Sequence, residues 1–180
     1  QRQMCIRDRL YRDGDYRMSL FVGCGCFFGL RVSDLRKLTW GMLLNEDKFI
    51  LNEQKTGKRR TIKINSDFQK HIQQCYNALE ISDIDEACFL SRKNMVMSTQ
   101  RINVRLKEIK KKDNIKIDNF SCHSLRKAFG RKVFESSGEN AQMALVKLSE
   151  LFNHSSVQIT KIYLGLREKE LLETYDLLDF

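Results

Sequence analysis

Two residues three positions apart, His123 and Arg126, are the clearest candidates for chemistry in this sequence. Residues i and i+3 lie on one face of a helix, so an imidazole and a guanidinium at this spacing can bind one anion together. Leu125 then points the other way, towards the core. The further candidates are one arginine, one lysine, one histidine and one tyrosine: Arg31, Lys55, His154 and Tyr163.

The two arginines of this set suit a phosphodiester. Its transition state spreads negative charge over the non-bridging oxygens, and the forked guanidiniums of Arg31 and Arg126 can hold those oxygens. His154 can add a hydrogen bond to the same phosphate. Donors arranged in this way stabilise the transition state electrostatically.

The tyrosine supplies the candidate nucleophile. A phenol has a pKa near 10, so the Tyr163 hydroxyl needs cationic neighbours or a base to react at neutral pH. His123 is the candidate base, and Lys55 can protonate the leaving oxygen. Each residue also has an ordinary structural interpretation when taken alone: a core tyrosine for Tyr163, a surface base for Arg31 and a helix-capping histidine for His123. The remaining histidine, His71, is expected at the surface.

The elements that must position these residues are mostly helices. Helices are expected at 16–28, where Gly29 ends the element, and at 34–38, with Ser33 as the cap. Ser66, Ser98, Ser121 and Ser156 are expected to cap further helices, the last over 157–164. Another helix is marked by Leu145, Leu148 and Phe152. Three short strands are expected at 40–44, 48–53 and 59–64. The predicted fold class is α+β: a mostly helical domain with a small three-stranded antiparallel sheet.

The chain is basic, with 32 Lys and Arg against 23 Asp and Glu among 180 residues, a formal net charge of +9. This balance favours a polyanion as partner, nucleic acid first and an anionic membrane surface second. Residues 55–63 hold no acid, and residues 101–116 carry an excess of positive charge. Solvated helix faces are the ordinary interpretation of such runs, but two runs in one basic chain favour a phosphate-backbone footprint. The candidate DNA-binding residues are Lys58, Arg59, Arg60, Arg101 and Arg105.

Several other classes of protein are excluded by pattern. The longest apolar run, 18–30, is shorter than the roughly 18 residues that span a membrane. The six cysteines form no C-x-x-C pair, so a reducing cytoplasm with free thiols is expected. No phosphate-binding loop, dinucleotide motif or clustered carboxylate site is present, so we expect no cofactor and no metal. Residues 1–15 lack clear periodicity and are interpreted as a leader of unknown origin, with one domain over 16–180.

Together the candidate residues resemble the tyrosine recombinases of the phage-integrase family. Gly29-Leu-Arg31-Val-Ser-Asp34 running to Trp40 resembles the family's first arginine motif, and Lys55-Thr-Gly-Lys its hairpin lysine. His123-Ser-Leu-Arg126 resembles the H-x-L-R box. His154 and Tyr163 resemble the closing histidine and tyrosine. The six elements recur in the family's order across residues 16–166.

Small departures from the family pattern leave every candidate catalytic group in place. Asp34 stands where the family often has Glu, and Lys127 where it often has His. Asn153 replaces the usual Gly before the second histidine, and asparagine is the residue besides glycine that best tolerates positive φ. The proline common after the hairpin lysine is missing. Lys58 is a rival to Lys55, and the sequence leaves both open.

The resemblance implies the catalytic domain of a site-specific recombinase or integrase of a mobile genetic element. It implies a 3′-phosphotyrosyl intermediate on Tyr163, double-stranded DNA as partner and a homotetramer on paired DNA sites. It also implies a bacterial, DNA-associated and cytoplasmic protein without a membrane partner. A type IB topoisomerase-like strand transferase and a non-catalytic DNA-binding integrase relic are the alternatives.

Two expectations concern the ends of the chain. The family's N-terminal core-binding domain is not recognisable, so we expect weak, poorly specific DNA binding and a monomer when this chain is alone. The acidic stretch 167–180 carries an apolar stripe, namely Leu171, Leu172, Tyr175 and Leu178. By resemblance this stripe docks on a neighbouring copy; packing on the chain's own core is the alternative.

Overall fold

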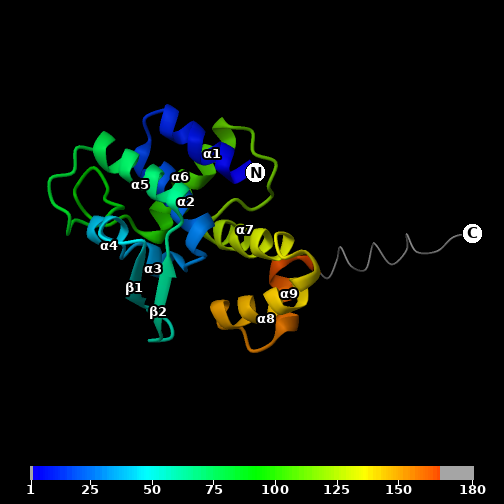
Figure 1. Cartoon of the computed structure of the whole chain (residues 1–180). Coiled ribbons are helices and arrows are strands. Elements are labelled where there is room, and N and C mark those ends of the chain that lie inside the picture. The colour runs from blue at the N-terminus through cyan, green and yellow to red at the C-terminus, as the bar shows by residue number, and fades with distance from the viewer. Residues whose placement is uncertain (1, 167–180) are drawn as a thin grey trace, which may run out of the picture. The chain divides into compact units, whose positions relative to one another are not determined.

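The chain folds into nine α-helices, one short 3-10 helix and one β-hairpin over the residues that the structure describes (Figure 1). This computed structural model describes residues 2–166, with side chains from residue 5 onwards. Two compact units divide the chain, Gln1–Arg126 and Lys127–Phe180. The helices before the hairpin are α1 (Arg2–Arg12), α2 (Tyr16–Phe28), α3 (Val32–Leu35) and α4 (Trp40–Leu44). The later elements are β1 (Lys48–Asn52), β2 (Arg59–Lys63), α5 (Ser66–Ala78), α6 (Thr99–Lys112), α7 (Cys122–Glu135), η1 (Gly138–Asn140), α8 (Ala141–Phe152) and α9 (Val157–Leu164).

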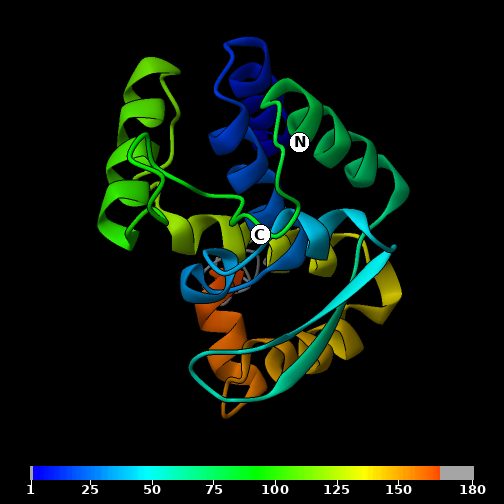
Figure 2. The same cartoon turned by 90° about the vertical axis from the view of Figure 1, so that its left-hand side faces the viewer.

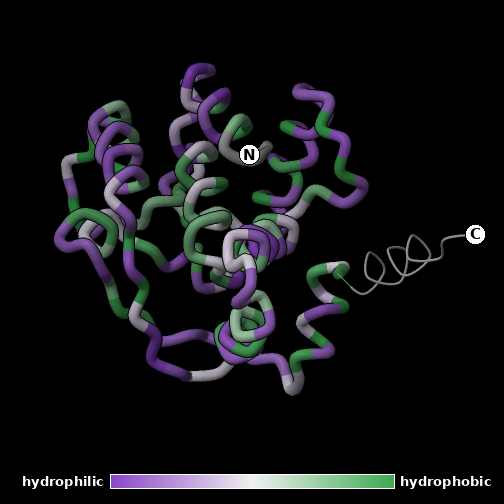
Figure 3. The backbone as a smooth tube through the Cα atoms, turned by 45° about the vertical axis from the view of Figure 1, so that its right-hand side comes forward, coloured by the Kyte–Doolittle hydropathy of each residue, from purple (hydrophilic) through white to green (hydrophobic). Residues whose placement is uncertain are grey.

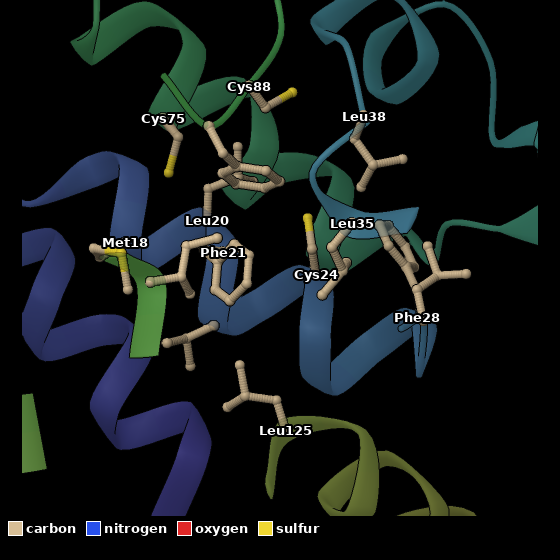
Figure 4. Packing of buried hydrophobic residues seen from close by; sticks show 14 of the residues in the cluster. Met18, Leu20, Phe21, Cys24, Phe28, Leu35, Leu38, Cys75, Cys88 and Leu125 are labelled. Atoms are coloured by element: carbon tan, nitrogen blue, oxygen red, sulfur yellow. The ribbon is translucent and has the colours of Figure 1, made fainter. Parts of the chain in front are cut away.

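Helix α2 is the centre of the first unit's core. Its bounds match the predicted helix, and Gly29 ends it with a φ of 58°, a left-handed conformation that glycine adopts without strain. Around α2, Figure 4 shows buried side chains from several elements, including Leu35, Cys75, Cys88 and Leu125. A Cβ on Gly25 would stand 2.8 Å from the Leu125 side chain, so a glycine here lets α2 and the first turns of α7 approach closely.

The sheet has two antiparallel strands, which confirms the hairpin but not the third predicted strand. Phe49 pairs with Ile62 and Leu51 with Arg60, so these four side chains share the inward face. Figure 2 shows β1 and β2 side by side as a two-stranded ribbon. The strand predicted over 40–44 was wrong: it is helix α4. Thr39 caps this helix through a bond from the Met42 N–H, and a five-residue apolar run fits either element by pattern.

Helix α1 lies within residues 1–15, where the sequence showed no clear periodicity. Ile6 and Leu10, one helical turn apart, are buried in the same core as α2. The turn into α2 is capped by Asp15, whose carboxylate accepts from the Met18 N–H. The rest of α1 is rich in charged residues, which concealed the short apolar stripe.

The expectation of a surface position for His71 was also wrong. On α5 this residue lies between Phe68 and Cys75, and its side chain is 6% exposed. Its ring lies 3.1 Å from the Ser19 hydroxyl and 5.6 Å, between centroids, from the Tyr11 ring. Asn65, one residue before the predicted Ser66, caps α5.

The second unit has a smaller hydrophobic core of its own. Leu145, Leu148 and Phe152 of α8 and Leu164 of α9 are buried in it. Helix α9 has the bounds that its flanking Ser156 and Gly165 predicted. Figure 3 shows hydrophobic and hydrophilic stretches alternating along most helices, as expected for elements with one buried face.

Two further expectations concern membrane-spanning helices and the apolar stripe near the end of the chain. Among residues 2–166, none of the helices combines the length and the apolar character that crossing a bilayer requires. The predicted apolar stripe within 167–180 lies outside the described residues.

Candidate active site

Arg31 is held at the start of α3 by a buried carboxylate. It is the N-cap residue of this helix, with extended backbone, two residues earlier than the predicted cap Ser33. Its guanidinium donates from Nη1 to Oε2 of Glu53 over 2.8 Å, and its side chain is 19% exposed. The partner directly follows β1 and lies 22 residues along the chain. The arginine is therefore set in a fixed direction and partly withdrawn from solvent.

Arg126 is anchored to the same turn. This side chain, 5% exposed, donates from Nη1 to the carbonyl oxygen of Gly29 over 2.7 Å. Gly29 lies two residues before Arg31, so one short turn of backbone carries one candidate arginine and binds the other. Two guanidiniums carried or bound by one turn are of the type that suits a single anion with two charged oxygens.

Lys55 lies in the exposed tip of the hairpin between β1 and β2. The tip is tied at its base: the Gln54 N–H donates to the buried carboxylate of Asp34 over 2.8 Å. Thr56 donates its hydroxyl to Glu53 over 2.9 Å. The rival residue Lys58 is exposed at the far side of the same tip, so both lysines belong to one anchored loop.

His123 lies in the first turn of α7 and is exposed to solvent. The helix start is fixed by Asn103, whose side-chain oxygen accepts from the Cys122 N–H over 3.1 Å. His123 and Arg126 are thus three residues apart on one helix, the arrangement that the sequence predicted.

The second unit brings His154 and Tyr163 together. Their rings are in edge-to-face contact with centroids 5.3 Å apart, and each ring also contacts Phe152. His154 Nδ1 lies 2.9 Å from the hydroxyl of Thr160, a fully buried residue three positions before Tyr163. Asn153 turns the chain between α8 and His154 with a φ of 53°, so asparagine fills the place of a glycine. Thr160, which lies on the same helix as Tyr163, therefore holds the His154 imidazole beside the Tyr163 phenol.

The predicted site residues therefore form two groups, one in each unit. The first group contains Arg31, Lys55, His123 and Arg126. The second contains His154 and Tyr163.

The five candidate DNA-binding residues differ in their surroundings. Lys58, Arg59 and Arg101 are exposed. Arg60 is turned inwards: it donates to the Phe28 carbonyl over 3.0 Å and lies 3.5 Å from Glu53 Oε1. Burial lowers the pKa of Arg60. The guanidinium of Arg105 bridges two carboxylates, those of Asp15 and Glu108.

Glu53 and Thr160 are the residues that the sequence interpretation missed. A signal was available for Glu53, because it is a lone acid just before the acid-free run 55–63. Burial raises the pKa of Glu53, but the hydrogen bond from Thr56 and the charge of Arg31 outweigh it, and the net result is a lowered pKa. The carboxylate is therefore ionised at neutral pH. Among residues 2–166, no group of His, Cys, Asp and Glu side chains has the arrangement to hold a metal ion.

Comparison with known proteins gives one consistent result. The model of the phage integrase family matches residues 7–170. The tyrosine recombinase XerC of Pseudomonas fluorescens is 28% identical over 160 residues, which are 88% of this chain and 50% of that protein. The chain spans about half the length of the curated relatives that it matches.

Solved structures share the fold. The crystal structure of XerA recombinase matches 100% of this chain and 63% of its own, with a TM-score of 0.71 and 22% identity. The XerH site-specific recombinase bound to palindromic difH substrate matches 90% of this chain and 46% of its own, with a TM-score of 0.65 and 15% identity.

Proposed function

The chain belongs to the phage integrase family, and from that premise we propose that it is the catalytic part of a site-specific DNA recombinase. The observation that carries the proposal is the pair of arginines at the Gly29 turn: Arg126 is bonded to this turn and Arg31 follows it. Such a pair fits a phosphodiester, whose two non-bridging oxygens each accept a charge-assisted hydrogen bond.

The proposed reaction breaks and remakes a DNA strand. The Tyr163 oxygen attacks the phosphorus, and His123 takes the phenolic proton. The bond from phosphorus to the 5′ oxygen breaks, and that oxygen receives a proton from Lys55 or from Lys58. The products are a 3′-phosphotyrosyl link and a 5′-hydroxyl. The reverse attack by a 5′-hydroxyl of another strand joins it and restores the phenol.

The remaining groups stabilise the charge that develops on the phosphate. Arg31 and Arg126 bind its non-bridging oxygens, and His154 donates a further hydrogen bond. Thr160 holds the His154 ring in place for this task, as the contact of 2.9 Å supports.

We propose double-stranded DNA as the partner, with Lys58, Arg59 and Arg101 as phosphate contacts. Arg60 and Arg105 belong to the same basic runs, but their carboxylate partners support a structural part for both. We further propose that the protein serves a mobile genetic element in a bacterial cytoplasm and works as a homotetramer on paired sites. The segment 167–180 is the proposed docking element between copies.

A nicked duplex tests the reaction. The nick lets a short 5′-hydroxyl fragment diffuse away after cleavage, so a covalent protein–DNA product accumulates and is seen on a denaturing gel. We expect the product with the unaltered chain and none with Tyr163→Phe. Tyr76→Phe is the matched control, because this ring packs on Trp40 in the other unit. It should retain the product.

The other outcomes separate the alternatives. A product with Tyr163→Phe would show that the nucleophile is another residue. Relaxation of supercoiled plasmid without strand exchange would identify a type IB topoisomerase-like activity. DNA binding without any covalent product would identify a non-catalytic relic.

A further inference from the structure

Glu53 carries a carboxylate that is 4% exposed and lies between an arginine and the hairpin tip. Its Oε2 atom accepts from Arg31 Nη1 over 2.8 Å and from the Thr56 hydroxyl over 2.9 Å. Its Oε1 atom is 3.5 Å from Arg60 Nη1. One carboxylate oxygen thus joins a candidate phosphate-binding group to the residue directly after Lys55.

The backbone of Glu53 closes the same loop. Its N–H donates to the Lys58 carbonyl over 3.0 Å, and its carbonyl accepts from the Gly57 N–H over 2.8 Å. Residues 54–57, which include Lys55, are therefore fixed to Glu53 at both ends. Any shift of this residue moves the hairpin tip together with the guanidinium that its side chain holds.

The surrounding charges make this contact compatible with binding a phosphate. A buried carboxylate is costly unless it is paired, and Arg60 shares the pairing with Arg31. Arg60 lies opposite Leu51 on the inward face of the hairpin, where it can pair with Glu53. A guanidinium has five N–H donors, and Glu53 binds that of Arg31 through Nη1.

We propose that Glu53 is a positioning residue that couples two parts of the reaction: it orients Arg31 for the phosphate and holds the hairpin tip whose lysine protonates the leaving oxygen. The inference rests on the proposed function. In this proposal the Glu53 carboxylate aligns both Arg31, which donates to the phosphate, and the lysine that acts as general acid.

The chemistry of the leaving group separates the two tasks. Two nicked duplexes are compared, one with the natural 5′ bridging oxygen at the cleavage site and one with sulfur there. An alkoxide leaves only with a proton, whereas a thiol has a pKa of about 8.5 and leaves as thiolate without one. A defect in proton delivery therefore disappears on the sulfur substrate, and a defect in phosphate binding remains.

Glu53→Gln keeps the shape of the side chain and removes its charge. We expect covalent product to form about 100-fold more slowly on the oxygen substrate, the effect of a small misplacement at a reacting centre. On the sulfur substrate the rate should remain about tenfold below that of the unaltered chain, because the contact that orients Arg31 is weakened there too.

Thr56 tests the hairpin contacts, because its hydroxyl donates to Glu53 over 2.9 Å and accepts from the Lys58 N–H over 3.3 Å. Thr56→Val removes both of these hydrogen bonds within the hairpin tip and keeps the volume of the side chain. We expect a loss of about tenfold on the oxygen substrate and a rate within about twofold of the unaltered chain on the sulfur substrate. Thr56→Ser, which keeps the hydroxyl, should restore both rates. A loss that is equal on the two substrates would overturn the coupling to proton delivery.

Glu86→Gln is the control for general loss of structure, because Glu86 also pairs with an arginine of the same unit, Arg17, at 3.2 Å, with a more exposed side chain than that of Glu53. Rates that fall alike in Glu86→Gln and Glu53→Gln, with equal losses of thermal stability, would overturn the proposal. So would a Glu53→Gln rate within about twofold of the unaltered chain on oxygen. Absence of product from the unaltered chain is a different result, and it refutes the proposed function.

Discussion

At the scale of single residues, the candidate groups are held by partners far away in the sequence. Glu53 lies 22 residues from Arg31, and Gly29 lies 97 residues from Arg126. The short motifs around Arg31 and His123 could be recognised without a structure, because their residue types and local spacing carry the signal. The Glu53 contact could not be predicted in that way, since it depends on how the hairpin packs against the start of α3.

His71 supplies a prediction about pH at this scale. Burial, with help from the charge of Arg7, lowers the pKa of His71 to about 4. In the unfolded chain its pKa is about 6.5. Between these values the unfolded chain binds a proton that the folded chain does not, so stability falls as the pH is lowered from about 6.5 to about 4. Above this range His71 adds no pH dependence.

Urea unfolding at neutral pH and at about pH 5 measures this effect. His71 should contribute a loss of about 1.4 kcal/mol in the free energy of unfolding for each pH unit within the range. His71→Gln, which has no charge to gain, should show a smaller loss than the unaltered chain between the two conditions. Equal losses in the two proteins would contradict a buried, neutral His71.

At the scale of elements, the helices with strong local caps were predictable. Ser156 and Gly165 gave the bounds of α9, because an N-cap hydroxyl and a left-handed glycine act on the adjacent backbone. Helix α4 was mistaken for a strand, since five apolar residues show no period and the cap from Thr39 was overlooked. Helix α1 was missed because Ile6 and Leu10 are the buried residues among its described side chains, and their burial depends on packing against α2.

Gly130, on α7, lies at a close packing contact near the second group of site residues, His154 and Tyr163. A Cβ there would stand 2.7 Å from the Leu164 side chain and 3.0 Å from the Phe152 ring. Phe152 contacts both His154 and Tyr163. Gly130→Ala should therefore destabilise the protein by about 1–3 kcal/mol, as overpacking does, and displace the Phe152 ring that contacts Tyr163.

Thermal unfolding and the rate of covalent product formation on the nicked duplex check this expectation. The rate should fall by about tenfold. Gly41→Ala is the control, because a Cβ on this helical glycine of α4 finds its nearest atom at 3.4 Å. Its stability and rate should change little. A Gly130→Ala protein as stable and as fast as that control would show that α7 and α9 have room to adjust.

At the scale of the whole molecule, the net charge of +9 is unevenly available to a partner. On α6 the positive charges are partly matched: Arg105 pairs with Asp15 and Glu108, and Lys112 with Asp13. Asp113, at the end of this helix, pairs with Arg9 of α1. These bonds tie α6 to α1 and to the turn before α2. Part of the basic run therefore stabilises the fold.

Salt dependence of DNA binding separates the two kinds of base. Each phosphate contact adds a slope of about −0.9 to the plot of log affinity against log salt concentration. Arg101→Gln, which removes an exposed charge, should make the slope shallower by about that amount. Arg105→Gln should leave the slope nearly unchanged and lower the thermal stability. The reverse order would mean that Arg105 leaves its carboxylates to bind phosphate.

The cysteines, all six within the described part of the chain, give the protein a practical property. Cys24, Cys75, Cys88 and Cys122 are buried, and burial raises the pKa of Cys26 and Cys75 to about 12, so these thiols are poor nucleophiles. Cys5, on α1, is exposed. A maleimide dye should therefore attach at one place on the native chain. The labelled chain can then be followed by fluorescence without first replacing the other five cysteines.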